Sequence, residues 1–286
     1  MPSAPNFKAY RGEYGANRPQ DLNSLSLPPA KLPLFNSGVL RKQWRYVAVH
    51  SPEVQICAAN VSIGPFKQMF WAVWDRENKQ LHEHTSIRNI GVEVPEGRLL
   101  IRDAGIEVEL DLGEGPGVET VSPSGKAWTW TRKQGGIPAT GRVSINGREL
   151  ALSAPAVVDD SAGFHPRHTD WRWSSGVGTN AAGQAIAWNM VNGLNDIDGG
   201  SEQTVWVDGV PTELGPPNIS TDLTNVTFTE GGQLNFAEEA VRRANEDRVL
   251  LKSRYSQPFG TFSGSIPHAG EITDGLGVME SHSAVW

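Results

Sequence analysis

Residues 164–173, reading Phe-His-Pro-Arg-His-Thr-Asp-Trp-Arg-Trp, hold the densest group of side chains that could do chemistry. Tryptophan prefers burial and buried charged groups need partners, so such a cluster indicates a use. If the segment is a strand, alternation puts His168, Asp170 and Arg172 on one face and the two tryptophans on the other. This predicts a titratable row backed by an aromatic wall. The alternative is a core strand whose polar face is solvated or hydrogen-bonded.

Asp170 is the candidate catalytic acid. Desolvation in an apolar, tryptophan-lined cavity would raise the pKa of its carboxyl group, which could then donate a proton to an alkene or an epoxide. Arg167 or Arg172 beside it would favour the charged form instead. The alternative role for Asp170 is therefore a strand aspartate paired with one of these arginines.

His168 and His282 are candidates for a base or an orienting group. Glu280 shares a face with His282 if the C-terminal segment is a strand, so a carboxylate could orient this imidazole. His165, His168 and His282 could also join Asp170 as nitrogen and oxygen ligands of a metal. Because their spacing matches no specific metal motif, no metal site is predicted.

An apolar pocket is expected around these groups, because a small-molecule site needs aromatic and apolar walls with a few polar groups. The chain contains ten tryptophans, most of which should fill the core. Tyr255 or Asn189 is expected to donate a hydrogen bond to the substrate. The residues predicted to line the pocket are Trp173, Trp188, Asn189, Met190, Trp206, Phe259 and Met279.

Several classes of protein are excluded by what the sequence lacks. It contains no nucleophile elbow, phosphate-binding glycine loop or dinucleotide fingerprint, so any chemistry should be non-redox and need no cofactor. A formal charge of −7, with 25 basic and 32 acidic residues and no basic stripe, excludes a nucleic-acid partner. The single cysteine, Cys57, allows no intrachain disulfide and is expected to be a buried small hydrophobe.

The expected location is the cytoplasm. The N-terminus lacks the apolar core of a signal peptide. No apolar run approaches the ~20 residues needed to cross a bilayer, so no stable membrane insertion is expected. The predicted partner is a hydrophobic small-molecule ligand, and homodimer formation stays an open alternative.

The pattern of turns predicts an all-β fold. Gly (31) and Pro (19) are spread along the chain, and such regular punctuation is typical of a sandwich or barrel. Asn146-Gly147, between two alternating segments, is a strong hairpin signal. The predicted strands cover residues 44–50, 55–63, 68–75, 80–85, 98–102, 106–111, 126–132, 141–152, 171–178, 184–192, 204–207 and 225–229.

The segment 236–250 is ambiguous, because its propensity allows a helix. We favour two strands turning at residues 245–247, since all-β neighbours must pair somewhere. The predicted organisation is an N-terminal arm over residues 1–40, a first β domain over 41–155 and a second over 156–286. The boundary is placed near the acidic pair Asp159-Asp160.

The second half of the chain also carries a series of recognisable motifs. They are residues 171–178 (Trp-Arg-Trp-Ser-Ser-Gly-Val-Gly), 187–193 (Ala-Trp-Asn-Met-Val-Asn-Gly), 201–202, 205–209, 255–260 (Tyr-Ser-Gln-Pro-Phe-Gly) and 277–286. The series resembles the bacterial domain-of-unknown-function family 2804, which is common in actinobacteria, from about Trp44 onward. More distantly it resembles the carotenoid 1,2-hydratases and the cyclases built on the same plan.

This resemblance implies two lipocalin-like β-barrel or sandwich domains with a hydrophobic ligand cavity at or between them. In the carotenoid hydratases, an aspartate in a histidine-rich motif ahead of a tryptophan is implicated as the proton donor. The nearest counterpart here is His168-Thr169-Asp170-Trp171. It departs from the family pattern by inserting Pro166-Arg167 and by lacking a second histidine beside the aspartate.

The favoured function is a cofactor-independent enzyme that hydrates, dehydrates, isomerises or cyclises a hydrophobic small molecule such as a terpenoid or lipid. The competing hypothesis is a non-catalytic carrier of the same kind of ligand. An enzyme should place at least two titratable groups within hydrogen-bonding reach inside the cavity, whereas a carrier needs only one polar anchor.

Overall fold

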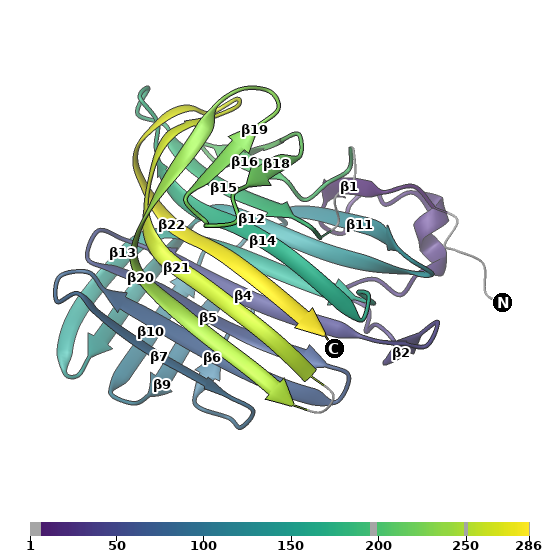
Figure 1. The fold of residues 1–286 in the computed structure, drawn as a ribbon, viewed down its shortest axis with the longest axis horizontal. Coiled ribbons are helices and arrows are strands. Elements are labelled where there is room, and N and C mark those ends of the chain that lie inside the picture. Colours follow the sequence, from purple (N-terminus) through teal and green to yellow (C-terminus); the bar gives the residue numbers. More distant parts are fainter. Residues whose placement is uncertain (1–6, 195–198, 249–250, 286) are drawn as a thin grey trace.

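The computed structural model describes residues 7–194, 199–248 and 251–285, and about two thirds of them lie in antiparallel strands (Figure 1). The first large sheet runs in the spatial order β7-β6-β5-β4-β13-β12-β10-β9-β8, and β11 pairs with β12 and β1 off this path. Its strands are β1 (Tyr10–Glu13), β4 (Lys42–His50), β5 (Val54–Ile63), β6 (Phe66–Asp75), β7 (Gln80–Ser86), β8 (Val92–Glu93), β9 (Arg98–Asp103), β10 (Ile106–Leu112), β11 (Val118–Ser124), β12 (Ala127–Ile145) and β13 (Arg148–Gly163).

The second large sheet is built entirely from the chain after residue 167, in the order β17-β16-β15-β14-β22-β21-β20-β19-β18. Its strands are β14 (His168–Thr179), β15 (Ala185–Asn192), β16 (Thr204–Val207), β17 (Val210–Glu213), β18 (Pro217–Ile219), β19 (Asn225–Phe228), β20 (Gln233–Arg248), β21 (Leu251–Ile266) and β22 (Gly270–Val285). A short 3₁₀ helix, η1 (Gln20–Ser24), and the small hairpin of β2 (Phe35–Asn36) and β3 (Val39–Leu40) lie between β1 and β4 in the chain.

The predicted all-β class is confirmed, and the local turn chemistry explains one hairpin directly. Asn146 and Gly147 have φ angles of 51° and 87°, as a two-residue turn between β12 and β13 requires. The segment predicted to turn at residues 245–247 is extended, as favoured, but the turn position is wrong. Strand β20 continues to Arg248, and residues 249 and 250 lie outside the described part of the chain.

The predicted boundary after residue 155 falls inside strand β13. Residues 148–163 of this strand pair with β12, and residues 156–163 also pair with β4 on the other side. The passage from one sheet to the other therefore lies at residues 164–167. The acidic pair Asp159-Asp160 belongs to a central strand of the first sheet and does not mark a linker.

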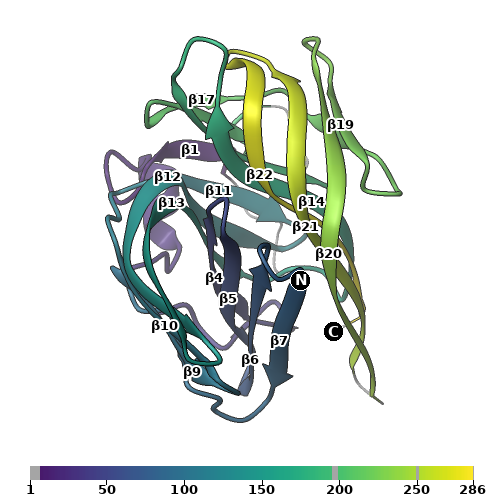
Figure 2. The same cartoon turned by 90° about the vertical axis from the view of Figure 1, so that its left-hand side faces the viewer.

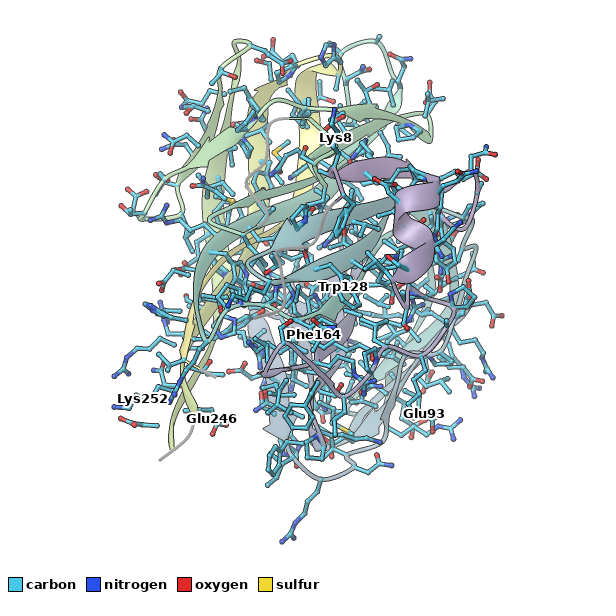
Figure 3. All side chains as sticks on the ribbon, turned by 90° about the vertical axis from the view of Figure 1, so that its right-hand side faces the viewer. Lys8, Glu93, Trp128, Phe164, Glu246 and Lys252 are labelled. Atoms are coloured by element: carbon cyan, nitrogen blue, oxygen red, sulfur yellow. The ribbon has the colours of Figure 1, made fainter. Side chains whose placement is uncertain are left out.

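The described part of the N-terminal arm, from residue 7 onward, packs on the first sheet. Strand β1 pairs with β11, and η1 brings Leu22 against the first sheet. Leu22 joins a cluster that includes Trp128 and Phe164, whose rings pack edge to face with centroids 5.0 Å apart (Figure 3). Apolar burial of this kind fastens the arm to the sheet.

Three apolar clusters determine where a cavity can form. One, including Val47, Ile56 and Leu110, fills the concave side of the first sheet, which curls into a half-barrel (Figure 2). Another, including Trp188 and Met279, is formed by side chains of the second sheet. A third lies between the sheets, where the long strands β20, β21 and β22 cross over β4, β5 and β6 (Figures 1 and 2).

One glycine allows the first sheet to bend toward this interface. Strand β12 contains a bulge between Gly135 and Ile137, and Gly136 adopts a φ of 71°, which costs glycine little. The bend lets β12 pair with β11 on one side of the bulge and with β10 on the other. No helix in the described residues has the length and apolarity needed to cross a membrane.

Candidate functional site

A cavity of about 130 Å³ lies between the two sheets. Strands β4, β5, β6, β12 and β13 form one wall, and β14, β15, β20, β21 and β22 contribute to the other. Most of its surface is apolar. The aromatic residues that line it are Trp44, Tyr46, Phe70, Trp171, Trp173 and Tyr255.

Glu280 on β22 is the central polar group of the second-sheet wall. Its side chain is buried, and it accepts hydrogen bonds from Tyr255 Oη (2.7 Å), Trp171 Nε1 (2.7 Å) and Gln257 Nε2 (3.3 Å). Register explains the arrangement, because Trp173 pairs with Glu280 and Trp171 pairs with His282 across β14 and β22. These pairs place the indole donor of Trp171 beside the carboxylate.

Burial raises the pKa of Glu280 to about 7. The hydrogen bonds from Tyr255 and Trp171 act in the opposite direction, since they favour the charged form. The negative charge of Asp159 adds to the rise, and the positive charge of Arg242 opposes it. Among the described residues, no lysine or arginine lies within ion-pair distance of Glu280. The carboxyl group can therefore carry or release a proton near neutral pH.

His282 lies beside this carboxyl group on the same face of β22. Its Nε2 is 2.8 Å from Ser253 Oγ, and its ring packs against Trp171 and Tyr255. Burial, helped by the positive charge of Arg242, lowers the pKa of His282 to about 3. The imidazole is therefore neutral at physiological pH. It contacts a hydroxyl group, whereas Glu280 accepts its hydrogen bonds from Tyr255 and Trp171.

A second polar cluster connects the first-sheet wall with the segment before β16, which carries Glu202. Lys133 Nζ on β12 is 2.5 Å from Asp159 Oδ1 and 2.8 Å from Glu202 Oε2, and all three side chains are buried. Burial alone would lower the pKa of Lys133, but the two carboxylates outweigh it and the pKa is raised. Burial raises the pKa of Asp159, against the opposing charge of Lys133. One cation is thus shared by two carboxyl groups.

A chain of hydrogen bonds links the two sheets next to the cavity. Gln257 Nε2 donates to both Tyr46 Oη (3.1 Å) and Glu280, and Cys57 Sγ donates to Gln257 Oε1 (3.3 Å). Burial raises the pKa of the Cys57 thiol to about 12, so it stays protonated. Cys57 is fully buried, which confirms the prediction of a small buried hydrophobe.

The placement expected for Asp170 and His168 is wrong. Their side chains are 59% and 65% exposed, form an ion pair of 2.9 Å with each other and lie outside the cavity lining. The alternation of β14 was predicted correctly, but its tryptophan face turns toward the cavity and its titratable face turns away. Burial of the larger apolar area decides this orientation. Asp170 is therefore not the desolvated acid that was expected.

Of the seven residues predicted to line the pocket, only Trp173 does so. Trp188, Met190 and Met279 belong to the core of the second sheet, and Phe259 to the apolar cluster between the sheets. Trp206 packs with Val157 and Val177 in a separate small cluster. Asn189 supports the site indirectly, because its Oδ1 accepts the indole hydrogen bond of Trp173 at 2.8 Å.

The three histidines considered as metal ligands lie in different surroundings. His165 is buried and stacks on Trp44, His168 is exposed, and His282 lies in the cavity. The described residues contain no group of three or more His, Cys, Asp or Glu side chains placed to hold a metal ion.

Sequence reasoning missed four charged residues of the cavity. Lys133, Asp159, Glu202 and Arg242 all line it. Asp159 was assigned to a domain boundary, and the other three were given no role in a site. Charged side chains are rarely buried without partners, so a single charged residue in the sequence gives little sign that it faces a cavity.

Comparison with solved structures supports the architecture. A protein from Nitrosomonas europaea provisionally assigned as AttH is similar over 90% of this chain and 98% of its own, with a TM-score of 0.55 and 12% identity. Kievitone hydratase from Nectria haematococca is similar over 84% of this chain and 88% of its own, with a TM-score of 0.51 and 12% identity. At this identity the likeness shows a common lipocalin-like two-domain fold.

Comparison with curated protein sequences finds no match. The family model described as "Domain of unknown function (DUF2804)" matches residues 82–286, which is most of the chain. Both large sheets contribute to this match, as do all the strands that carry Glu280, Tyr255 and Lys133. The expected family is therefore confirmed, and this chain belongs to the DUF2804 family.

Proposed function

We propose that this protein is a hydratase- or cyclase-like enzyme that acts on a hydrophobic small molecule, such as a terpenoid, in the cavity between its two sheets. One observation carries the proposal. Glu280 is a buried carboxyl group with a pKa near 7, and it lines an aromatic cavity. General acid–base catalysis is most effective when the pKa of the group lies near the working pH.

In the hydration direction, the alkene of the substrate takes the proton of Glu280 and a carbocation forms at the neighbouring carbon. A water molecule then adds to this carbon, and the proton it loses returns to the Glu280 carboxylate. Dehydration reverses these steps. Isomerisation instead returns a different carbon-bound proton to the Glu280 carboxylate. In cyclisation a second alkene attacks the cation, and the new cation then loses a carbon-bound proton to the same carboxylate. None of these routes changes the oxidation state of the protein or consumes a cofactor.

The other groups of the cavity suit this chemistry. Tyr255 and Trp171 stabilise the Glu280 carboxylate that forms when the proton leaves, because both donate hydrogen bonds to it. The faces of Trp44, Trp171 and Trp173 offer electron-rich surfaces for a carbocation. His282 is neutral and can accept or pass on a proton only transiently.

Two observations favour an enzyme over a carrier. Glu280 and Tyr255 are two titratable groups within hydrogen-bonding reach of each other, and both line the cavity. A carrier would need only one polar anchor, and a carboxyl group with a raised pKa is costly to keep for that purpose. The likeness in fold to kievitone hydratase supports a hydration or dehydration reaction in particular.

The test measures proton transfer and does not require the natural substrate to be identified first. Kievitone and a set of unsaturated terpenoids are incubated with the protein in deuterated, oxygen-18-labelled water and analysed by mass spectrometry. Deuterium on carbon reports protonation by the enzyme, and oxygen-18 reports addition of water. We expect a substrate to gain one or both labels.

Glu280→Gln should lower this label incorporation by ~10²–10⁴-fold, because the variant has no proton to donate. Asp170→Asn is the matched control, since it neutralises an exposed carboxyl group and should leave the rate unchanged. Equal rates in Glu280→Gln and the unmodified protein would contradict the role of Glu280. A tightly bound ligand that never gains label would favour a carrier.

A further inference from the structure

Arg242 on β20 is the second cationic side chain of the cavity lining, after Lys133. It is only 2% exposed, and its guanidinium group lies against two aromatic rings. The carbon Cζ is 4.0 Å from the ring centroid of Phe70 and 4.8 Å from that of Tyr255. The two ring centroids are 6.1 Å apart and the rings are tilted by 53°, so both rings contact the cation from neighbouring sides and leave N–H groups for hydrogen bonds.

The N–H donors of the Arg242 guanidinium group are not all engaged in hydrogen bonds. Nη2 donates to Thr85 Oγ1 on β7 at 2.6 Å. Nε lies 3.4 Å from Glu83 Oε2 but is a buried donor without a hydrogen-bond partner. Nη1 donates to no group among the described residues. Buried donors are normally satisfied, so the unsatisfied Nε indicates that the hydrogen bonds of Arg242 are incomplete, and Nη1 offers further N–H groups to an acceptor.

The charge of Arg242 is also only partly balanced. Lys133, the other cation of the lining, is held by both Asp159 and Glu202 within 2.8 Å. Arg242 has only Glu83, which is about one-third exposed and lies outside the cavity lining. Glu246 lies further along the same strand, β20 (Figure 3). It accepts a hydrogen bond from Gln68 Nε2.

From this geometry we infer that the cavity takes an apolar molecule with one carboxylate, whose oxygens bind the guanidinium edge of Arg242. A carboxylate is planar and accepts two parallel N–H bonds, which matches the fork of donors that a guanidinium group offers. The apolar body of the ligand lies against the tryptophans of the cavity. The inference names the substrate class of the proposed enzyme and therefore rests on the proposed function. Binding of such a ligand can still be measured without turnover.

The position of Arg242 also connects the head group of the ligand with the acid. Arg242 and Glu280 line the same cavity, both contact Tyr255, and the charge of Arg242 favours the ionised form of Glu280. A bound carboxylate would cancel part of this charge. Glu280 would then hold its proton more firmly when a ligand is present, as a proton donor should.

The test compares two probes that differ only in their head group, laurate and dodecanol, by titration of the tryptophan fluorescence at pH 8. The unmodified protein should bind laurate at least about tenfold more tightly than dodecanol, as expected for a charge-assisted bond in a buried site. Arg242→Gln should remove this preference. Arg243→Gln, an exposed neighbour on the same strand, is the matched control and should keep it.

Glu83→Gln removes the competing carboxylate without touching the cavity lining, so it should raise the affinity for laurate a few-fold. A variant that merely loosened the fold would not produce such a gain, so this result holds even if Arg242→Gln fails to fold. Equal binding of laurate and dodecanol, or no binding of either, would overturn the inference. So would unchanged laurate affinity in Glu83→Gln.

The outcomes also separate this inference from the proposed function. Laurate preference without any label incorporation would leave the ligand class standing and reject the enzyme. Label incorporation that depends on Glu280 but is unaffected by Arg242→Gln would support the enzyme and reject the carboxylate ligand.

Discussion

The two polar clusters of the cavity compensate for the burial of their carboxyl groups in different ways. In one cluster, Asp159 of the first sheet and Glu202, from the segment before β16, share the cation of Lys133. On the second sheet, Glu280 has only neutral donors, from Tyr255, Trp171 and Gln257. Neutral donors offset burial only in part, and the pKa of Glu280 rises to about 7. The comparison teaches that burial raises the pKa of both Asp159 and Glu280, and that of the two only Asp159 has a cation in ion-pair contact to oppose the rise.

The largest loss of unfolding free energy should come from removing the cation of Lys133. Lys133→Met leaves two buried carboxyl groups without their cation, and removal of one partner from a buried ion pair costs about 3–5 kcal/mol of unfolding free energy. Urea unfolding at pH 8 measures this loss. Lys133→Met combined with Asp159→Asn should recover part of it, because one uncompensated charge is gone. A loss below about 1 kcal/mol would show that Lys133 is not needed there.

Glu280→Gln should act in the opposite direction, and its effect should depend on pH. The folded-state pKa of Glu280 is about 7 and the ordinary value is 4.5, so the folded state holds this proton more tightly than the unfolded state. Stability from Glu280 is therefore lost as the pH rises from 4.5 through 7. Because each pKa unit corresponds to ~1.4 kcal/mol, the variant should gain roughly 3 kcal/mol over the unmodified protein between pH 4 and pH 8.5.

Chemical unfolding of both proteins at several pH values measures this gain. The lost hydrogen bonds of the carboxylate shift the whole curve but not its slope with pH. A stability difference that stays constant between pH 4 and pH 8.5 would contradict the raised pKa of Glu280.

A smaller effect is expected from Tyr255→Phe. The hydroxyl group donates to Glu280 Oε2 at 2.7 Å, and this bond lowers the pKa of Glu280. Its removal should raise that pKa further and reduce the unfolding free energy at pH 8 by about 1–2 kcal/mol, the usual cost of such a bond. Thermal unfolding at pH 5 and pH 8 tests both parts, since the loss should be larger at pH 8. The reverse order would argue against the hydrogen bond to the carboxylate.

Asp170→Asn should have the smallest effect. The ion pair of Asp170 with His168 is exposed, and such pairs contribute about 0–1 kcal/mol. The unfolding free energy at pH 8 should change by less than about 0.5 kcal/mol. A larger loss would mean that the titratable face of β14 has a structural role that its exposure does not indicate.

The sequence predicted local structure well because local structure depends on neighbouring residues. The turn at Asn146-Gly147 and the alternation around Trp171 follow from φ preferences and strand geometry. The sequence did not predict which face of β14 meets the cavity. That choice depends on a second sheet whose strands lie far away in the chain. Lys133 and Arg242 were missed for the same reason, since each becomes a site residue only where the two sheets meet.

Of the carboxyl groups named from sequence, Asp170 was chosen as the acid because it lies in a dense cluster, and Glu280 as a group that could orient His282 because the two share a strand face. The structure places the first in solvent and the second in the cavity. Density of reactive residues in the sequence thus proved a weaker indicator than position on a strand facing a second sheet. The sequence alone gives no indication that Glu280 has no ion-pair partner among the described residues.

The central claim is that Glu280 is a buried acid with a pKa near neutrality, and carbon-13 NMR of the protein labelled at glutamate side-chain carboxyl carbons tests it most directly. The account predicts one glutamate signal that titrates near pH 7, is absent in Glu280→Gln and is unchanged in Asp170→Asn. If every glutamate signal titrates below pH 5.5, Glu280 is an ordinary carboxylate and the account is wrong.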